Sequence, residues 1–171
     1  ASSVNIDYSA PTISVLSIVS NNPNNASVAK LGDLITVNLT ASESISLPTI
    51  SIAGNTMAVT GSAGTYSATY LVSASSLEGG GISVLFEDVA GNAGTNVSST
   101  TNGSSVIIDK TNPTISSATL SWGSVIDGTE MASSATVTAT LAGIEDGVSI
   151  SALINGISTT ATVNSNSATF T

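Results

Sequence analysis

The sequence predicts an all-β fold, built as two modules in tandem of which the second is incomplete. Short runs of alternating apolar and polar residues, broken by Gly, Asn, Pro and Ser, fill the chain, and no stretch keeps a helical period. The motif Ile-Asp-x-x-x-Pro-Thr-Ile occurs twice, starting at Ile6 and at Ile108, 102 positions apart. Hydrophobic residues make up 41% of the chain but aromatic residues only 4%, so the cores must consist of Val, Ile, Leu and Ala.

The repeated motif is interpreted as a seam between modules. Each copy passes from an apolar strand through Asp7 or Asp109 to Pro11 or Pro113 and into a second apolar strand. Proline fixes its own φ and keeps the preceding residue extended, so a helix cannot run through this joint. The seams predict the end of a preceding module and a linker at 1–9, a first sandwich at 10–110, and a second, truncated sandwich at 111–171.

The first module contains a regular succession of predicted strands. In Leu34–Ala41 the residues Ile35, Val37, Leu39 and Ala41 alternate with polar residues, which predicts a half-buried strand. A turn at Gly54-Asn55 ends another short strand. The other strands are expected at 12–19, 49–53, 58–60, 65–72 and 82–87, and a closing strand ends at 106–109, with Ile82, Val84 and Phe86 facing inward. About seven strands with turns every 8–12 residues are typical of an immunoglobulin-like β-sandwich.

The second module repeats this plan. Thr136-Val137 matches Thr36-Val37, Ser167–Phe170 matches Ser67–Tyr70, and Asn155-Gly156 predicts a hairpin between strands at 149–154 and 157–163. Counterparts of residues 72–109 are missing from the sequence, which would leave sheet edges and half a core exposed. We therefore expect tandem immunoglobulin-like β-sandwiches, the second incomplete, with the missing strands supplied by a longer polypeptide or by another chain.

The charge balance restricts the classes of partner. Eleven acidic residues face two basic ones, Lys30 and Lys110, and the net charge is −9. Such a chain cannot neutralise phosphates or bind an anionic membrane surface, so we expect no nucleic acid and no membrane contact, but cations as partners. The alternative interpretation is that the negative charge only keeps an exposed protein soluble.

The composition also argues against catalysis. The chain has no His, Cys or Arg, so a nucleophile would lack its usual base and no disulfide can form. A carboxylate pair such as Glu43 with Asp88 is the one formal option, for glycoside hydrolysis. We expect no enzymatic activity.

Four segments together resemble the bacterial Ig-like tandem repeat of cell-surface proteins. They are Lys30–Val37 with its Gly-Asp, Thr40–Glu43, the Asp-x-Ala-Gly-Asn turn within Phe86–Asn92, and the seam Ile108–Thr114. The first seam has Ser9-Ala10 where Thr-x is usual, and the second module lacks the Gly-Asp. The resemblance implies extracellular, tandemly arrayed, non-catalytic domains of adhesins, surface-layer proteins or secreted enzymes.

Calcium is the candidate ligand. Glu87, Asp88 and Asn92 lie together at a turn, Asp109 precedes the joint, and Ca²⁺ takes six to eight oxygen ligands of this kind. The resemblance implies that acids of the seam and of this turn hold Ca²⁺ between neighbouring modules. The alternative is that Asp88 and Asn92 merely cap their own turn through hydrogen bonds to the backbone.

Two further features are weaker. Four Asn-x-Ser/Thr sequons, at Asn25, Asn38, Asn96 and Asn102, are candidate glycosylation sites, although chance alone gives about that number in so Ser/Thr-rich a chain. Trp122 could belong to a sugar-stacking platform, but a single Trp just beyond a strand is more often a core or seam residue.

These observations predict a structural module of a large extracellular cell-surface protein, either a surface-layer or an adhesin-stalk polypeptide. Its expected partners are neighbouring Ig-like modules of the same polypeptide, further copies in a surface array, and cations. The alternative is a carbohydrate-binding accessory module of a secreted enzyme, against which the sparse aromatic residues argue.

Overall fold

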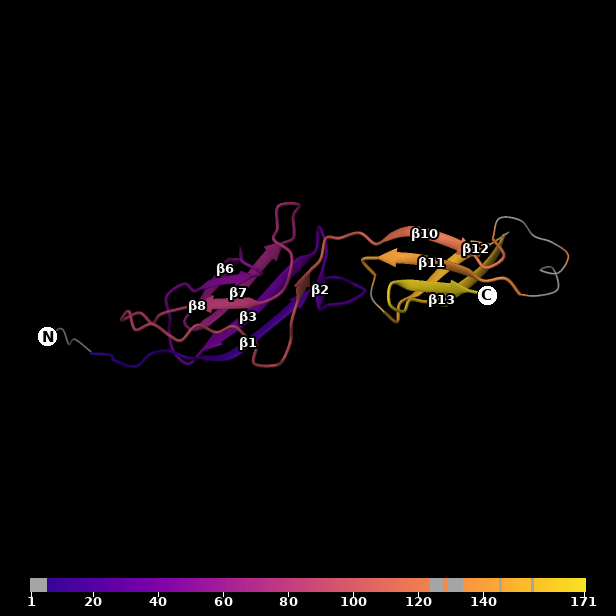
Figure 1. The fold of residues 1–171 in the computed structure, drawn as a ribbon. Helices are drawn as coiled ribbons and strands as arrows, with labels where there is room; N and C mark the ends of the chain where they lie inside the picture. The colour runs from indigo at the N-terminus through magenta and orange to yellow at the C-terminus, as the bar shows by residue number, and fades with distance from the viewer. Residues whose placement is uncertain (1–5, 124–127, 129–133, 145, 155) are drawn as a thin grey trace. The chain divides into compact units, whose positions relative to one another are not determined.

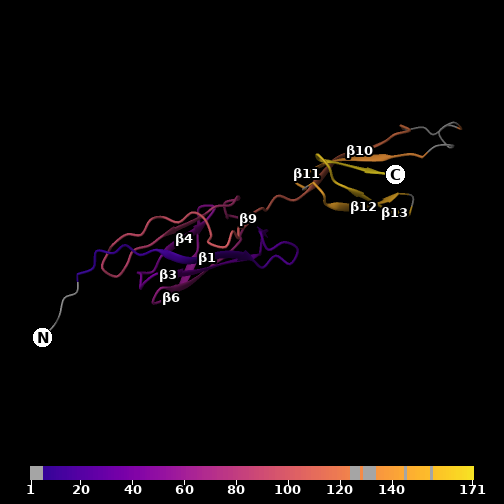
Figure 2. The same cartoon turned by 90° about the horizontal axis from the view of Figure 1, so that it is seen from below.

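The structure is a computed structural model that describes residues 6–123, 128, 134–144, 146–154 and 156–171. The described residues form strands, turns and loops but no helix, as Figures 1 and 2 show, so the all-β prediction is confirmed. None of them lies in a helix that could span a membrane. The chain divides into two compact units, Ala1–Lys110 and Thr111–Thr171.

Unit 1 consists of two antiparallel sheets and one short parallel pair. The four-stranded sheet has the order β1 (Ile13–Ser20), β3 (Leu34–Ala41), β7 (Thr65–Leu71), β6 (Ala58–Ser62). The three-stranded sheet has the order β5 (Asn55–Thr56), β4 (Thr49–Ile52), β8 (Ile82–Leu85). The parallel pair is β2 (Val28–Ala29) with β9 (Ile107–Ile108).

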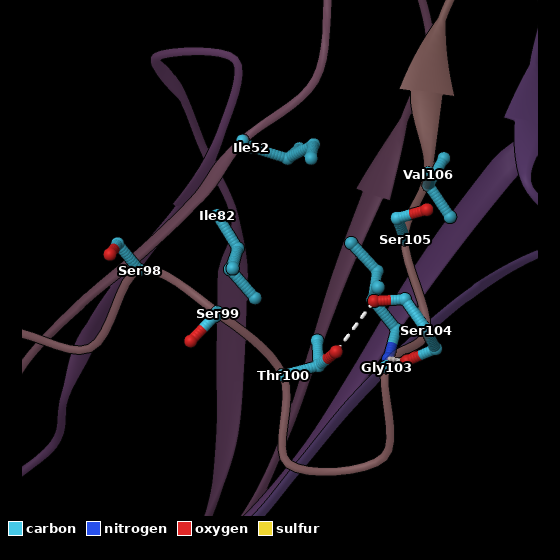
Figure 3. A pocket seen from close by; sticks show the side chains of 11 residues that line it. Ile52, Ile82, Ser98, Ser99, Thr100, Gly103, Ser104, Ser105 and Val106 are labelled. Atoms are coloured by element: carbon cyan, nitrogen blue, oxygen red, sulfur yellow. Dashed lines mark hydrogen bonds between the residues drawn. The ribbon is translucent and has the colours of Figure 1, made fainter.

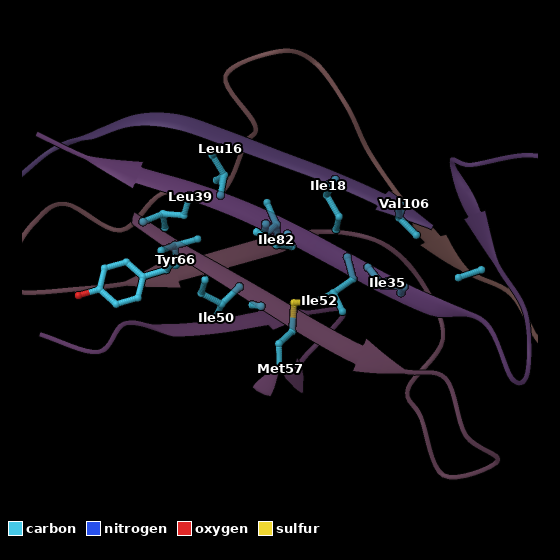
Figure 4. Close-up of a cluster of buried hydrophobic side chains, with 14 of the residues drawn as sticks. Leu16, Ile18, Ile35, Leu39, Ile50, Ile52, Met57, Tyr66, Ile82 and Val106 are labelled. Carbon is cyan, nitrogen blue, oxygen red and sulfur yellow. The ribbon is translucent and has the colours of Figure 1, made fainter. Parts of the chain in front are cut away.

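The two sheets share one core, because alternate residues of each strand point to the same side (Figure 4). The predicted inward faces of β3 and β8 are confirmed: Ile35, Val37 and Val84 are fully buried, and Phe86, just after β8, is 7% exposed. Apart from Phe86, Tyr66 and Met57, the core consists of Val, Ile, Leu and Ala, as the composition requires. Its members are Leu16, Ile18, Ala29, Ile35, Val37, Leu39, Ile45, Ile50, Ile52, Met57, Tyr66, Ala68, Val72, Ile82, Val84, Phe86, Val106 and Ile108.

One predicted turn is wrong by a residue. The turn after β4 is Ala53-Gly54, with φ of 49° and 80°, and Asn55 already belongs to β5. The side-chain amide of Asn55 donates to the carbonyls of Ile52 (3.0 Å) and Leu77 (2.9 Å), and its oxygen accepts from the Leu77 backbone. Asn55 is therefore a buried link between two loops rather than a turn residue.

Unit 2 consists of a three-stranded sheet and a hairpin. The sheet has the order β10 (Thr114–Leu120), β11 (Val137–Ala142), β14 (Ser167–Phe170), and the hairpin is β12 (Ser149–Ile154) with β13 (Ile157–Thr162). The hairpin confirms the prediction, although Asn155 of its turn lies outside the described residues. The described core is small: Ala139, Leu141, Ala161, Val163, Ala168 and Phe170.

The two units repeat one strand pairing in detail. Ser14 interrupts the register of β1 with β3, and Ser116 interrupts that of β10 with β11 in the same way. Each serine hydroxyl donates to a carbonyl of the partner strand, that of Thr40 at 3.0 Å and that of Thr140 at 3.2 Å. The register makes β10 the counterpart of β1 at an offset of 102 residues.

The remaining registers refine the repeat. Val37 pairs with Ala68, whereas Val137 pairs with Phe170, so β14 matches β7 at an offset of 102 rather than the 100 that the sequence match indicates. The pairs Ile52–Asn55 and Ile154–Ile157 at the ends of the two hairpins likewise match β12 to β4 at an offset of 102. A shift of two residues keeps every side chain on the same face, which is why the sequence could not reveal it.

Candidate metal site

Three carboxylates from distant parts of unit 1 come together. Asp7 belongs to the first seam, Glu43 to the loop after β3, and Asp88 to the turn after β8. One carboxylate oxygen from each residue lies within 4.8 Å of one oxygen of each of the other two. Asp7 is exposed, Glu43 is half-buried and Asp88 is only 2% exposed. This set, the acidic cluster, could hold a metal ion.

Asp88 is fixed by its own turn. Its Oδ1 accepts from the backbone N–H groups of Ala90 and Asn92, both at 2.8 Å, and its Oδ2 accepts from the Asn92 side chain at 2.7 Å. Its backbone also forms a bridge to Ile45. The turn-capping interpretation is thus present in the structure, and it gives Asp88 a single orientation.

These hydrogen bonds control the charge of Asp88. Desolvation by burial acts to raise the pKa of the carboxyl, but the Asn92 side chain and the backbone N–H groups of Asn92, Ala90 and Gly91 together lower the pKa below its ordinary value. Asp88 is therefore ionised at neutral pH. A glycosidase needs one carboxyl with a raised pKa as its acid, so Asp88 is unsuited to that role in a pair with Glu43.

Asn92 joins the seam to this turn. The same side-chain amide that donates to Asp88 also donates to the backbone carbonyl of Asp7 at 3.1 Å. The carboxylate of Asp7 accepts from the backbone N–H of Ser9 at 2.9 Å, which stabilises a local turn just before Pro11. Asn92 therefore holds the backbone of Asp7 beside the Asp88 carboxylate.

Glu43 is positioned by the start of β1. The backbone N–H of Ser42 donates to the Thr12 carbonyl at 2.8 Å, and the Thr12 N–H donates to the Ser42 hydroxyl at 3.0 Å. On the other side lies Gly64, where an added Cβ would come within 2.7 Å of the Glu43 carbonyl. The loop that carries Glu43 is thus tied to Thr12 of the first seam.

The spacing suits one divalent ion. Ca²⁺ binds oxygens at about 2.3–2.6 Å, so two oxygens on the same ion lie at most about 5 Å apart. A carboxylate has about four lone-pair sites, and Asp88 uses three of them in the hydrogen bonds above, which leaves one on Oδ2. Asp7 and Glu43 offer their remaining oxygens, and water would complete the six to eight ligands.

Neither lysine of the chain neutralises the cluster. Lys30 pairs with Asp33 at 3.4 Å. The ammonium of Lys110 donates to the carbonyls of Ala74 and Ser76 at 2.9 and 2.6 Å. Because the sequence has no other Lys, Arg or His, the mutual repulsion of the three carboxylates has no side-chain cation to offset it.

The structure brings some of the predicted residues together and separates others. Asp88 is in the cluster and Asn92 supports it. Glu87 is exposed although its neighbour Asp88 is buried, because neighbouring residues of an extended chain face opposite ways. The backbone of Glu87 forms a bridge to Ala93. Asp109 lies after β9, where its N–H donates to the Ala29 carbonyl at 2.9 Å, and it is not a member of the cluster.

Asp7 and Glu43 are the members that the calcium prediction omitted. Both carried a signal: Asp7 is the first copy of the seam aspartate, and Glu43 ends one of the four segments that resemble the bacterial repeat. The four sequon asparagines, Asn25, Asn38, Asn96 and Asn102, are all exposed, and Asn38 faces away from the core as expected.

A separate small cavity lies beside β1 (Figure 3). It has a volume of about 280 Å³ and combines an apolar floor with a serine- and threonine-rich rim. Its lining residues are Ile18, Ile52, Gly81, Ile82, Ser98, Ser99, Thr100, Gly103, Ser104, Ser105 and Val106. None of these is aromatic, so the cavity has no ring on which a sugar could stack.

Comparisons with family models, with curated proteins and with solved structures find no match for the chain.

Proposed function

We propose that the chain is a non-catalytic structural segment of a large extracellular cell-surface protein, of surface-layer or adhesin-stalk type. Its immunoglobulin-like sandwiches would form a stiff acidic array, with Ca²⁺ fixing the first seam to the module that follows it. The observation that carries the proposal is the meeting of Asp7, the seam acid, with Asp88 and Glu43 within 4.8 Å.

The cation would act on the seam mechanically. Without it, the three carboxylates repel one another, and the side-chain amide of Asn92 links Asp7 to the Asp88 turn. With it, the carboxylate of Asp7 is bonded through the ion to two anchored loops of unit 1. Binding to the folded state alone stabilises by mass action, about 2.7 kcal/mol at a hundredfold excess of ligand over Kd.

The composition supports the extracellular setting. A net charge of −9 keeps an exposed protein soluble and suits a setting outside the cell, where calcium is plentiful. The segments that resemble the bacterial repeat support an array of neighbouring modules. Lateral self-assembly would distinguish a surface layer from a stalk.

Thermal unfolding of the 171-residue chain with millimolar Ca²⁺ or with chelator tests the proposal. We expect a higher Tm with Ca²⁺, loss of that response in Asp7→Asn and Glu43→Gln, and a normal response in Asp109→Asn. The last variant removes an equivalent charge outside the cluster, so it controls for net charge. A wild-type Tm that is the same with Ca²⁺ and with chelator would show that the acids only cap turns and keep the protein soluble.

Ion choice gives a second measurement. Mg²⁺ demands near-ideal octahedral geometry at 2.0–2.1 Å, whereas Ca²⁺ accepts irregular sites that are partly filled by water. We therefore expect isothermal titration to show tighter binding of Ca²⁺ than of Mg²⁺. If both ions gave equal binding heats, and if Asp7→Asn did not change those heats, the ions would only screen the negative charge and would not occupy a site.

A further inference from the structure

Equivalent positions of the two units differ sharply in burial. Leu16 and Ile18 of β1 are 0% and 5% exposed, whereas all seven residues of β10 are exposed, and Leu120, the counterpart of Ile18, is 37% exposed. In the other sheet, Ile52 is 1% exposed but its counterpart Ile154 is 36% exposed. The described strands of unit 2 thus match β1, β3, β4, β5 and β7 of unit 1, but one side of its core is open.

Unit 1 shows what covers these positions. β8 pairs antiparallel with β4, with Val84 opposite Ile50 and Ile82 opposite Ile52. In unit 2 the corresponding edge of β12 has no strand beside it among the described residues, because β12 pairs only with β13. That edge presents unpaired backbone groups next to half-buried Ala152.

A second segment of unit 1 covers the edge of β1. Thr101 accepts from the Leu16 N–H through its hydroxyl at 2.9 Å and donates its own N–H to the Leu16 carbonyl at 2.8 Å. The Ser104 hydroxyl accepts from the Ile18 N–H at 2.9 Å. No described residue makes the corresponding contacts to the outer edge of β10.

We propose that the open face of unit 2, formed by β10 and β12, is an acceptor for an extended polypeptide segment with the pattern of residues 82–106 of unit 1. Its alternating apolar strand would pair antiparallel with β12, and its Thr- and Ser-bearing stretch would lie along β10. Strand addition of this kind obtains affinity from main-chain hydrogen bonds and specificity from alternate side chains.

The geometry favours this occupant over a second copy of unit 2. β10 and β12 have the same registers as β1 and β4 of unit 1, as the repeated bulge at Ser14 and Ser116 and the matched hairpins show. In unit 1 the free edge of β4 is paired with β8, so a strand like β8 is the partner that fits β12. Two copies packed face to face would cover apolar side chains but leave the edge of β12 unpaired.

A synthetic peptide of residues 78–110 of this chain, added to the intact chain, tests the proposal. Trp122 is the only tryptophan, lies two residues beyond β10, and has no equivalent in the peptide, so its fluorescence reports on unit 2 alone. We expect a saturable blue shift of Trp122 and at least tenfold slower amide hydrogen exchange at Ala118 and Leu153, the counterparts of Leu16 and Ser51, because the N–H groups of these positions face the open edges. A peptide with Val84→Asn and Phe86→Asn should give neither effect.

Two chain variants make a matched pair. Ala118→Asp places a charge on the open face at the position of Leu16, and Thr119→Asp places the same charge on the opposite face of β10; both sites are exposed, so neither should prevent folding. We expect Ala118→Asp to abolish peptide binding and Thr119→Asp to keep it. Equal loss in both variants, or no protection in the wild type, would overturn the proposal. A wild-type dimer in sedimentation that Ala118→Asp dissociates would also overturn it, because the occupant would then be a second copy.

Discussion

Truncation of Phe86 is the most direct test of the core of unit 1. The side chain is 7% exposed and belongs to the core cluster between the two sheets. Phe→Ala changes at such sites cost about 3–5 kcal/mol, from lost transfer free energy and from the cavity that remains. A domain of this size has a total stability of about 5–15 kcal/mol, so Phe86→Ala should remove a large share of it.

Gly94 gives an independent check on the same contact. Its N–H donates to the Phe86 carbonyl at 3.0 Å, and a Cβ at this position would overlap the Phe86 ring. Gly94→Ala should therefore destabilise by about 1–3 kcal/mol through overpacking. In the double variant the alanine at position 86 makes room for the new methyl group at position 94. The stability lost by the double variant should therefore be smaller than the sum of the losses of the two single variants.

Urea unfolding followed by tyrosine near-UV circular dichroism measures these effects in unit 1. Tyr66 and Tyr70 both lie on β7, and Tyr66 is 5% exposed, so their signal depends on the folded core. Leu85→Ala is the control, since Leu85 is 54% exposed on the other face of β8, and it should change stability by no more than about 0.5 kcal/mol. A loss below about 1 kcal/mol for Phe86→Ala, or strict additivity with Gly94→Ala, would refute the burial of the Phe86 ring against Gly94.

Three further predictions follow from the two units and the cluster. Urea should unfold the chain in one main cooperative transition, that of unit 1, because unit 2 has a small core and an open face; two transitions of comparable size with no partner present would contradict this. Because folding lowers the pKa of Asp88, its contribution is present above about pH 4 and is lost as the pH falls through the folded pKa. Asp88→Asn should therefore weaken the acid dependence of stability below about pH 4, and an unchanged pH profile in denaturant titrations would count against the capping role. Gly64→Ala should lower both Tm and Ca²⁺ affinity, because Gly64 has a φ of +84° and contacts the Glu43 carbonyl. A Ca²⁺ affinity that calorimetry finds unchanged would show that Gly64 does not position Glu43.

The inward faces of the long strands could be predicted because the side-chain period of a strand is two. Ile35, Val37 and Leu39 are buried as their alternation with polar residues requires. The turn after β4 could not be placed to the residue, since Gly54-Asn55 is a normal turn pair and the burial of Asn55 depends on the distant Leu77. Contacts between loops far apart in sequence leave no periodic signal.

The acidic cluster could be predicted in part. The turn around Asp88 and Asn92 is local, so its residues and hydrogen bonds follow from the Asp-x-Ala-Gly-Asn motif. The sequence could not show which seam aspartate lies beside the Asp88 turn, because Asp7 and Asp109 occupy equivalent positions in two copies of one motif. The topology of the fold decides between them. The turn after β8 lies beside the loop after β3, which is tied to Thr12 of the first seam, and this selects Asp7.

The difference between the units shows how far a strand pattern alone can be taken. β1 and β10 share a bulge and a register, yet only β1 has a buried face. Period and pairing are properties of the strand itself, whereas burial requires a second segment to lie against it, as residues 101 and 104 do against β1. A sequence pattern that fits a half-buried strand therefore indicates a face that needs a cover, and the exposure of β10 and Ile154 marks where that cover belongs in unit 2.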